Sequence, residues 1–222
     1  MSDEQILVVP ANLFRAIGYF EGFSPDVPVY NMLLDEAVFK PRLLMETDDS
    51  YKQLIPYTTI MTEKEPNRPL FLSYQRGSEL AEERLHGKRS IGFGGHINPE
   101  DTAEGDDYTL GGYGAAVMRE LHEEVKLPER LKAPPALAGI INEDATEVGR
   151  VHLGLFHIVF IGGGFEPEPN EAGMCDFRWQ TLEQLQANLM EYEKWSRILI
   201  ESSALLDGIQ EDGTEPSHPS SE

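Results

Sequence analysis

The amino-acid sequence predicts an α+β fold in which a mixed β-sheet is sandwiched between helices. Three observations predict it: strand-like apolar segments precede a single acidic helix, more of them follow it, and a helical segment closes the chain. The chain has 222 residues, which is enough for one substantial hydrophobic core. We expect an N-terminal extension over residues 1–45 packed on a domain over residues 46–206, and a disordered acidic tail over residues 207–222.

Apolar segments of strand length supply the expected sheet, and polar or turn-forming residues separate them. The expected strands are residues 53–61, 69–75, 90–97, 137–142 and 150–161, with a further candidate at Asp176–Gln180. The polar segment Thr62–Arg68 predicts a hairpin loop between the first two. Residues 5–45 predict one or two more strands and a short helix near Leu13–Tyr19. The closing helix is expected from about Leu182 to Leu206 and could break near Glu193.

The acidic helix is expected from about Gly114 to Val125. Val117, Leu121 and Val125 stand four residues apart and form one apolar stripe, which would face the core. Pro128 lies just beyond the expected end, where a helix commonly stops.

Composition and charge exclude several classes of function. The formal net charge is −21, from 39 acidic and 18 basic residues, so the surface repels nucleic acid and anionic lipid. A phosphate substrate would need a cation in the site. No apolar run is long enough to span a bilayer, and the acidic start lacks the basic residues of a signal peptide. Because Cys175 is the single cysteine, no internal disulfide can form, and we expect a cytoplasmic protein without nucleic-acid or membrane partners.

The expected helix carries acids with metal-ligand spacing. Glu120, Glu123 and Glu124 are related by steps of three and four residues, so their carboxylates share one side of the helix. Like charges that close are unfavourable unless a hard cation such as Mg²⁺ binds the carboxylate oxygens. The alternative is a solvated acidic face in which Arg119 pairs with Glu123.

The neighbourhood of this helix resembles a known family. Gly95 followed by Arg119-Glu120-Leu121-His122-Glu123-Glu124-Val125-Lys126-Leu127 resembles the Nudix box, Gly-x5-Glu-x7-Arg-Glu-U-x-Glu-Glu-x-Gly-U, where U is aliphatic. The wider run, residues 52–57 and 90–98, is similar to a subgroup described as predicted phosphoesterases of the MutT type. The resemblance covers roughly residues 46–190 and implies a Nudix-type fold.

Two departures from the box stand out. The pattern has 13 residues between its Gly and its Arg, whereas 23 separate Gly95 from Arg119. Counted back from Arg119, the box Glu would fall on Gly111, so that acid is missing from its place, and Lys126 stands where the pattern has Gly. Acids of the long loop could substitute: Glu100, Asp101, Glu104, Asp106 or Asp107. We expect this acidic, glycine-rich loop, residues 98–112, to be mobile without metal and ordered by metal and substrate.

The resemblance implies roles for individual residues. Glu120 and Glu124 match metal ligands, and Glu123 matches a further ligand or water-orienting acid. Arg119 matches an arginine that positions a neighbouring carboxylate, and Gly95 matches a loop residue whose carbonyl joins the metal shell. Family members use Mg²⁺ or Mn²⁺ to hydrolyse a nucleoside diphosphate linked to another moiety. We therefore expect a small-molecule diphosphate as the substrate.

Other residues are candidates for the rest of the site. A further acid could come from Glu171 or from the group Glu143, Asp144 and Glu147; otherwise these are surface-loop acids. His96 follows the glycine pair Gly94-Gly95, and Arg76 flanks the loop that contains this pair in the sequence. Either residue could therefore contact a substrate phosphate. The strand histidines His152 and His157 are expected in the core or at a strand edge.

The sequence therefore predicts metal-dependent hydrolysis of a phosphoanhydride. The alternative is a Nudix-like domain that binds a nucleotide-like ligand without cleaving it, which the missing box acid and the Lys126 replacement favour. A plain acidic interaction domain is the third possibility. Nucleoside triphosphates, dinucleoside polyphosphates, nucleotide sugars, NADH, CoA and isoprenoid diphosphates all remain open as substrates. A homodimer through residues 5–45 is a further expectation.

Overall fold

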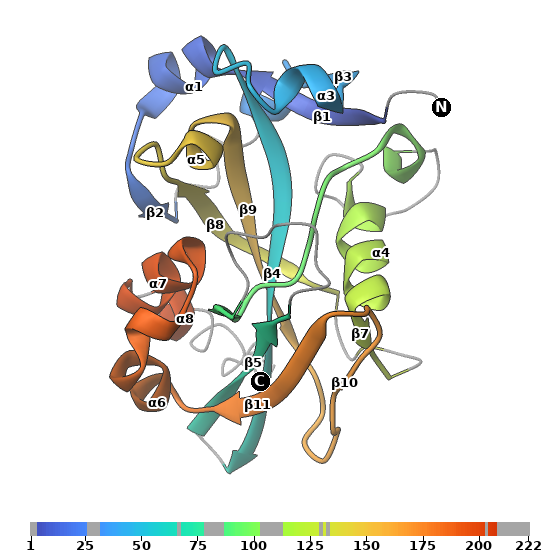
Figure 1. Cartoon of the computed structure of the whole chain (residues 1–222), viewed down its shortest axis with the longest axis vertical. Coiled ribbons are helices and arrows are strands. Elements are labelled where there is room, and N and C mark those ends of the chain that lie inside the picture. The colour runs from blue at the N-terminus through green and yellow to red at the C-terminus, as the bar shows by residue number, and fades with distance from the viewer. Residues whose placement is uncertain are drawn as a thin grey trace, which may run out of the picture.

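A mixed β-sheet runs through the middle of the molecule (Figure 1). The structure is a computed structural model that describes residues 4–25, 32–65, 68–77, 87–102, 113–128, 131, 134–202 and 204–207. The main strands are β2 (Gly22–Ser24), β4 (Tyr51–Glu65), β5 (Arg68–Arg76), β8 (Ala136–Asn142), β9 (His152–Phe160) and β11 (Met174–Gln180). They follow the order β11-β5-β4-β9-β8-β2. β4 and β9 are parallel, and the other pairs along this path are antiparallel.

Strand β4 organises the sheet because it has neighbours along both edges. β9 pairs with β4 from Gln53 to Met61 along one edge. On the other edge β1 (Gln5–Pro10) pairs with the start of β4 as far as Gln53, and β5 pairs with it from Met61 onward. The part of β4 between Gln53 and Met61 therefore has no strand ladder on that edge within the described residues.

Helices cover both faces of the sheet. On one face α4 (Gly114–Glu124) packs by Val117 and Leu121 into a cluster that includes Leu72, Tyr74 and Leu155. On the other face a second cluster joins the sheet to the C-terminal helices, which are α6 (Leu182–Ala187), α7 (Lys194–Glu201) and α8 (Ala204–Asp207). Figure 1 shows α4 on one side of the sheet and α6, α7 and α8 on the other. The predicted class, a mixed sheet between helices, is confirmed.

The N-terminal residues add to the same sheet. They form β1, α1 (Ala11–Gly18), β2, β3 (Val38–Pro41) and α3 (Arg42–Met45). β1 pairs with both β3 and β4, and β2 pairs with β8. The short helix expected near Leu13–Tyr19 is present as α1, which buries Ala11 and Phe14.

Several expected boundaries are wrong. The segment Thr62–Arg68 was expected as a loop, but the β4–β5 ladder continues through Thr62 and Glu63 because these residues pair with Leu70 and Pro69. The expected strand 90–97 shrinks to β6 (Arg89–Ser90), since its glycines lead into a loop. The start of the expected strand 150–161 belongs to a short helix, α5 (Glu147–Val151), because the Thr146 side chain caps its first turn.

The closing helix is divided into α6, a 3₁₀ turn η3 (Leu189–Glu191), α7 and α8. The break lies near Glu193, as the sequence indicated, because Tyr192 and Glu193 are extended. Most of the acidic loop, residues 103–112, and the tail 208–222 lie outside the described residues. Among the residues that are described, no helix is long and apolar enough to cross a membrane.

Leu121→Ala is expected to lower the free energy of unfolding by about 2–4 kcal/mol, because Leu121 is fully buried and truncation leaves a cavity. His122→Ala, on the exposed side of the same helix, is the control and should change stability by less than about 0.5 kcal/mol. Denaturant midpoints measure both. Equal midpoints for the two variants would contradict the packing of α4 on the sheet.

Candidate active site

The glycine loop, residues 91–97, lies beside the part of β4 that has no strand ladder on this edge. Phe93 exchanges two backbone hydrogen bonds with Thr58, with N···O distances of 2.8 and 2.9 Å. Further along, the Ile97 carbonyl accepts a hydrogen bond of 2.9 Å from the Leu7 amide of β1. The loop therefore replaces a strand between β1 and β5 and is held at both ends by the sheet.

Glycine is required in this loop because the backbone approaches β4 closely. A Cβ on Gly94 would lie 1.9 Å from the Pro56 carbonyl oxygen, and its φ of +146° is rarely adopted by residues with side chains. A Cβ on Gly92 would overlap the Tyr57 ring at 1.9 Å. A Cβ on Gly95 would lie 2.7 Å from Glu120 Oε1, so the Gly95 backbone directly faces that carboxylate.

Glu124 is the buried acid of the site. Its side chain is 8% exposed and accepts a 2.7 Å hydrogen bond from the Gly94 amide. Burial, followed by the charges of Glu120 and Glu171, raises the pKa of Glu124 well above its ordinary value, and the Gly94 hydrogen bond and the Arg76 charge only partly oppose this. The apolar stripe on the other side of α4 turns this carboxylate toward the glycine loop.

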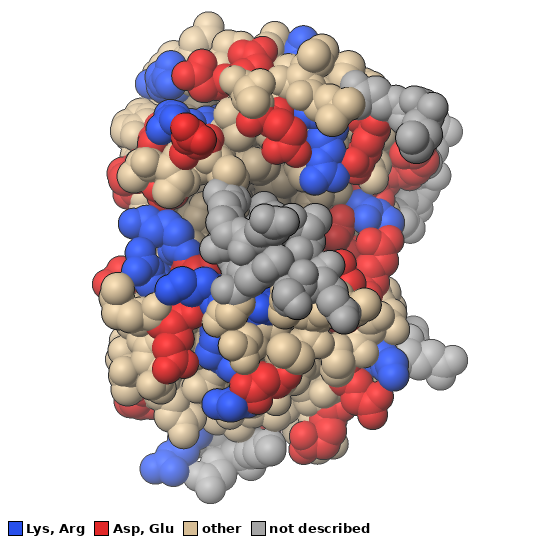
Figure 2. Space-filling view, in the orientation of Figure 1, with Lys and Arg blue, Asp and Glu red and all other residues tan. Residues whose placement is uncertain are grey.

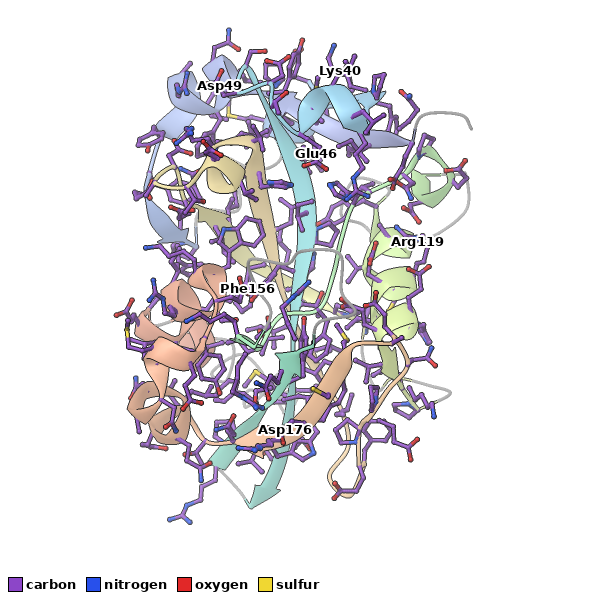
Figure 3. The ribbon with its side chains drawn as sticks, in the orientation of Figure 1. Lys40, Glu46, Asp49, Arg119, Phe156 and Asp176 are labelled. Atoms are coloured by element: carbon purple, nitrogen blue, oxygen red, sulfur yellow. The ribbon has the colours of Figure 1, made fainter. Side chains whose placement is uncertain are left out.

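Arg119 holds the exposed side of the same cluster. Its Nη1 donates to Glu120 Oε1 at 2.8 Å and to Glu123 Oε2 at 3.3 Å, and its Nη2 donates to the His96 carbonyl at 2.9 Å. Burial raises the pKa of Glu120, while Arg119 opposes that shift. Acidic side chains gather over α4 on this face (Figure 2), and Arg119 projects from α4 among them (Figure 3). Arg119 therefore links the helix acids to the glycine loop.

Asp101 occupies the box position that seemed empty in the sequence. Counted forward from Gly95, the pattern Gly-x5-Glu places its acid at residue 101, where an aspartate stands. Counted back from Arg119, the position falls on Gly111, which lies outside the described residues, and Asp101 is one of the loop acids expected to substitute for the box Glu. The extra ten residues fall between Asp101 and Arg119, within the part of the chain that is not described.

Asp101 binds Arg119 through both carboxylate oxygens. Arg119 Nε and Nη2 donate to Oδ1 and Oδ2 at 2.9 Å each, and the Asn98 amide donates to Oδ2 at 2.8 Å. Burial tends to raise the pKa of Asp101, but these hydrogen bonds outweigh it and the pKa is lowered. The short 3₁₀ turn η2 (Pro99–Thr102) presents this side chain to α4.

Glu171 is the distal acid that the structure brings to the cluster. The Asn170 amide donates to the Glu124 carbonyl at 2.9 Å, and Asn170 Nδ2 donates to the His122 carbonyl at 2.7 Å, so this loop is tied to the end of α4. Burial raises the pKa of Glu171, Arg76 opposes this, and Glu123 adds to it. Arg76, expected to contact substrate, thus lies within electrostatic reach of Glu171 and Glu124.

The other acids considered have different partners. Glu143 accepts hydrogen bonds from the Thr146 amide and hydroxyl, at 3.0 and 2.7 Å. Asp144 forms an ion pair of 2.6 Å with the buried Lys52. Both belong to the loop before α5, which Figure 1 shows across β4 from α4, and Glu147 begins α5 itself.

The histidines of the glycine loop and of β9 have structural partners, and His96 is half-buried. His96 Nε2 lies 2.8 Å from Gln53 Oε1, and burial, with nearby Arg42, His152 and Arg119, lowers the pKa of His96 to about 3. His157 is fully buried, and its Nε2 lies 3.0 Å from the Tyr113 hydroxyl. Tyr113 directly precedes α4, so this contact anchors the start of the helix to β9. No periodic pattern indicates this contact, because the two residues are 44 positions apart in the chain.

The donor set fits a divalent cation. Burial raises the pKa of Glu120, Glu124 and Glu171, and like charges add to this, so a hard cation among them would remove an unfavourable interaction. Within the described residues no three acidic, histidine or cysteine side chains already stand in a metal-ligating arrangement. Arg119 instead contacts Glu120 and Glu123, so a cation would compete with these contacts.

Asp101→Asn is expected to lower the free energy of unfolding by about 1–3 kcal/mol, because it weakens a charged, two-point contact of a buried carboxylate. Glu100→Gln is the matched control, because Glu100 is the exposed neighbour of Asp101 and loses the same charge without taking part in the Arg119 contact. Chemical denaturation measures both variants. A loss in Glu100→Gln as large as in Asp101→Asn would argue that net charge, and not the Arg119 contact, matters.

No protein-family model matches this chain. It is 32% identical to Protein YmaB of Bacillus subtilis (strain 168) over 207 residues, 90% of this chain and 97% of that protein. It is 30% identical to Tm1382, a solved structure described as a candidate Nudix hydrolase, with 93% and 99% of the two chains covered and a TM-score of 0.69. The MutT protein of Methanosarcina mazei Go1 is 20% identical over 70% of this chain and 94% of that one, with a TM-score of 0.48.

Proposed function

The chain belongs to the Nudix hydrolase family, and from that premise we propose that it hydrolyses the phosphoanhydride of a nucleoside diphosphate linked to another moiety, with Mg²⁺ or Mn²⁺ bound. One observation carries the proposal: the buried Glu124, bound to the Gly94 amide of the glycine loop, lies within electrostatic reach of both the Arg119-bound Glu120 and the loop acid Glu171. Neighbouring carboxylates whose pKa values are raised by burial and by one another are typical of a catalytic metal site.

Each residue of the cluster has a separate task in this proposal. Glu120, Glu124 and Glu171 are the side chains that would hold the cation, with the Gly95 carbonyl beside them. A bound divalent cation neutralises the diphosphate and lowers the pKa of its water. Glu123, whose side chain is 58% exposed, is the carboxylate open to solvent and is suited to orient the attacking water or accept its proton.

Arginines position the remaining groups. Arg119 fixes Glu120 and, through Asp101 and the His96 carbonyl, the glycine loop that caps Glu124. Arg76 donates to the Tyr74 hydroxyl at 3.2 Å and brings a positive charge to the edge of the acidic cluster, where a substrate phosphate would lie. His96, already paired with Gln53, is a weaker candidate for substrate contact than Arg76.

The alternative of binding without cleavage drew its support from the missing box acid and from Lys126. Asp101, one of the loop acids expected to substitute, contacts Arg119 through both carboxylate oxygens, and this supports hydrolysis over the alternative. Lys126, in place of the pattern's Gly, is the last residue of the short strand β7 (Val125–Lys126), which pairs with β10 (Glu168–Pro169) on the Glu171 side. That replacement therefore concerns how the distal loop is attached.

The test is a panel of diphosphates assayed with the full chain. Nucleotide sugars, dinucleoside polyphosphates, NADH, CoA and nucleoside triphosphates are each incubated with Mg²⁺, with Mn²⁺ and with EDTA, and mononucleotide or phosphate release is measured. Turnover of at least one substrate that requires the metal, and that Glu120→Gln removes, is expected. Thermal stabilisation by a nucleotide without turnover of any substrate would contradict hydrolysis and return the binding alternative.

A further inference from the structure

A cleft lies on the sheet face opposite α4. It has a volume of about 540 Å³, within the range of small-molecule sites, and its lining includes Gln75, Lys88, Arg89, Asp176 and Arg178. Gln75 lies between Tyr74 and Arg76 on β5, so its side chain points away from the acidic cluster. The cleft therefore belongs to the face that α6 and α7 cover.

The cleft is positively charged in a strongly acidic protein. Three of its lining residues, Lys88, Arg89 and Arg178, are cationic, against the two acids Asp176 and Glu191. The chain as a whole carries a net charge of −21. Figure 2 shows Lys and Arg side chains gathered on the α7 side of the molecule, away from the acids over α4. Such a local reversal of charge favours an anion at this place.

Asp176 organises the two arginines at the cost of backbone strain. It is the one non-glycine residue with positive φ, 52°, in the described part of the chain, and it lies in a register shift between Cys175 and Arg178. Its carboxylate binds Arg89 Nη1 at 2.8 Å and the Nε and Nη2 of Arg178 at 2.8 and 2.6 Å. Bulges and strained residues that aim side chains are typical of binding sites.

Arg89 has donor capacity left over. Its side chain is buried, and Nη2 binds the Ser73 hydroxyl at 2.8 Å and the Asp176 carbonyl at 2.9 Å. Its Nε is also buried, yet it has no hydrogen-bond partner among the described residues. A buried donor without an acceptor is unfavourable, and an anion in the cleft that Arg89 lines would interact favourably with this guanidinium.

The shape of the donors selects among anions. The Nε–Nη2 edge of Arg178, which would grip a carboxylate through two parallel hydrogen bonds, is already used by Asp176. A phosphate accepts hydrogen bonds from several directions and carries more charge, so it can take single contacts from Lys88, Arg89 and Arg178 together. We propose that this cleft binds the phosphate group of a small molecule, separately from the acidic cluster on α4.

The experiment is a calorimetric titration of the metal-free full chain with inorganic phosphate in 150 mM NaCl. Saturable binding with a Kd below about 1 mM is expected. General surface attraction is screened at this salt concentration, so such binding reports a specific site. Arg178→Gln and Lys88→Gln should each weaken binding by at least about tenfold, a loss of roughly 1.4 kcal/mol. Arg150→Gln, an exposed arginine on α5, loses the same charge and should bind like the unaltered protein.

Three results would overturn the proposal: no saturable binding, equal binding in Arg178→Gln and Lys88→Gln, or equal weakening in Arg150→Gln. Acetate that displaces phosphate at equal concentration would refute phosphate as the ligand class. AMP distinguishes the sources of the phosphate, because tighter binding of AMP than of phosphate assigns the site to a metabolite and equal binding assigns it to the free ion. Glu124→Gln should leave the Kd unchanged, so this result is independent of the proposed hydrolysis.

Discussion

Glu124→Gln is expected to reduce metal-dependent turnover by at least about 100-fold, which corresponds to roughly 2.7 kcal/mol of transition-state stabilisation. Glutamine keeps the size of the side chain and an acceptor for the Gly94 amide, but it removes the charge that a cation needs. The folded protein should not suffer, because burial and neighbouring acids already disfavour ionised Glu124. Steady-state rates at saturating Mg²⁺ and melting temperatures in EDTA measure the two effects.

Glu201→Gln is the matched control for this variant. Glu201 is exposed at the end of α7, on the other face of the sheet, and the substitution removes the same single charge. We expect unchanged turnover for Glu201→Gln and an unchanged or higher metal-free melting temperature for Glu124→Gln. Turnover of Glu124→Gln within a few-fold of the unaltered protein would remove Glu124 from the metal site.

Gly94→Ala is expected to destabilise the fold by at least about 3 kcal/mol, since it combines backbone strain with a steric overlap. The added Cβ would lie 1.9 Å from the Pro56 carbonyl oxygen and 2.8 Å from its carbonyl carbon, both of which are main-chain atoms of the central strand β4. Neither can move without disturbing the β4–β9 ladder. In a domain of this size the melting temperature should fall by about 6–12 °C.

Gly18→Ala separates the two contributions. Gly18 has a similar φ of +152°, but a Cβ there would meet nothing within 4 Å. Its loss of stability therefore reports backbone strain alone, about 1 kcal/mol, and the difference between the variants reports the overlap in the glycine loop. Melting temperatures of both variants in EDTA provide the comparison. If Gly94→Ala loses no more stability than Gly18→Ala, the loop does not lie against Pro56.

The sequence predicted the features that depend on neighbouring residues. The stripe of Val117, Leu121 and Val125 placed α4 within two residues of its observed end, because helical periodicity is local and burial follows it. The apolar runs likewise predicted β8 and β9, because a run of apolar residues is also a local feature of the sequence. The acidic spacing of Glu120 and Glu124 likewise indicated one carboxylate face before any tertiary contact was known.

Boundaries set by long-range pairing could not be predicted in this way. Thr62 and Glu63 are polar and looked like loop residues, yet they are strand because β5 offers them partners. The glycine segment after Ser90 looked like a strand, but its backbone meets the sheet only at Phe93, which pairs with Thr58, and at Ile97, which accepts from Leu7, since Gly94 must pass close to Pro56. In each case the pairing partner lies elsewhere in the chain, so the residues of the segment do not predict it.

The helix, its acids and the likeness to the Nudix box could be predicted from the sequence, because these depend on residue types at fixed short spacings. The contact of Asp101 with Arg119 and the approach of Glu171 to Glu124 are visible only in the folded chain, since loops bring both acids to α4. It also decided that Asp144 pairs with Lys52. Ion pairs across an insertion depend on where the chain returns, and the sheet fixes that place.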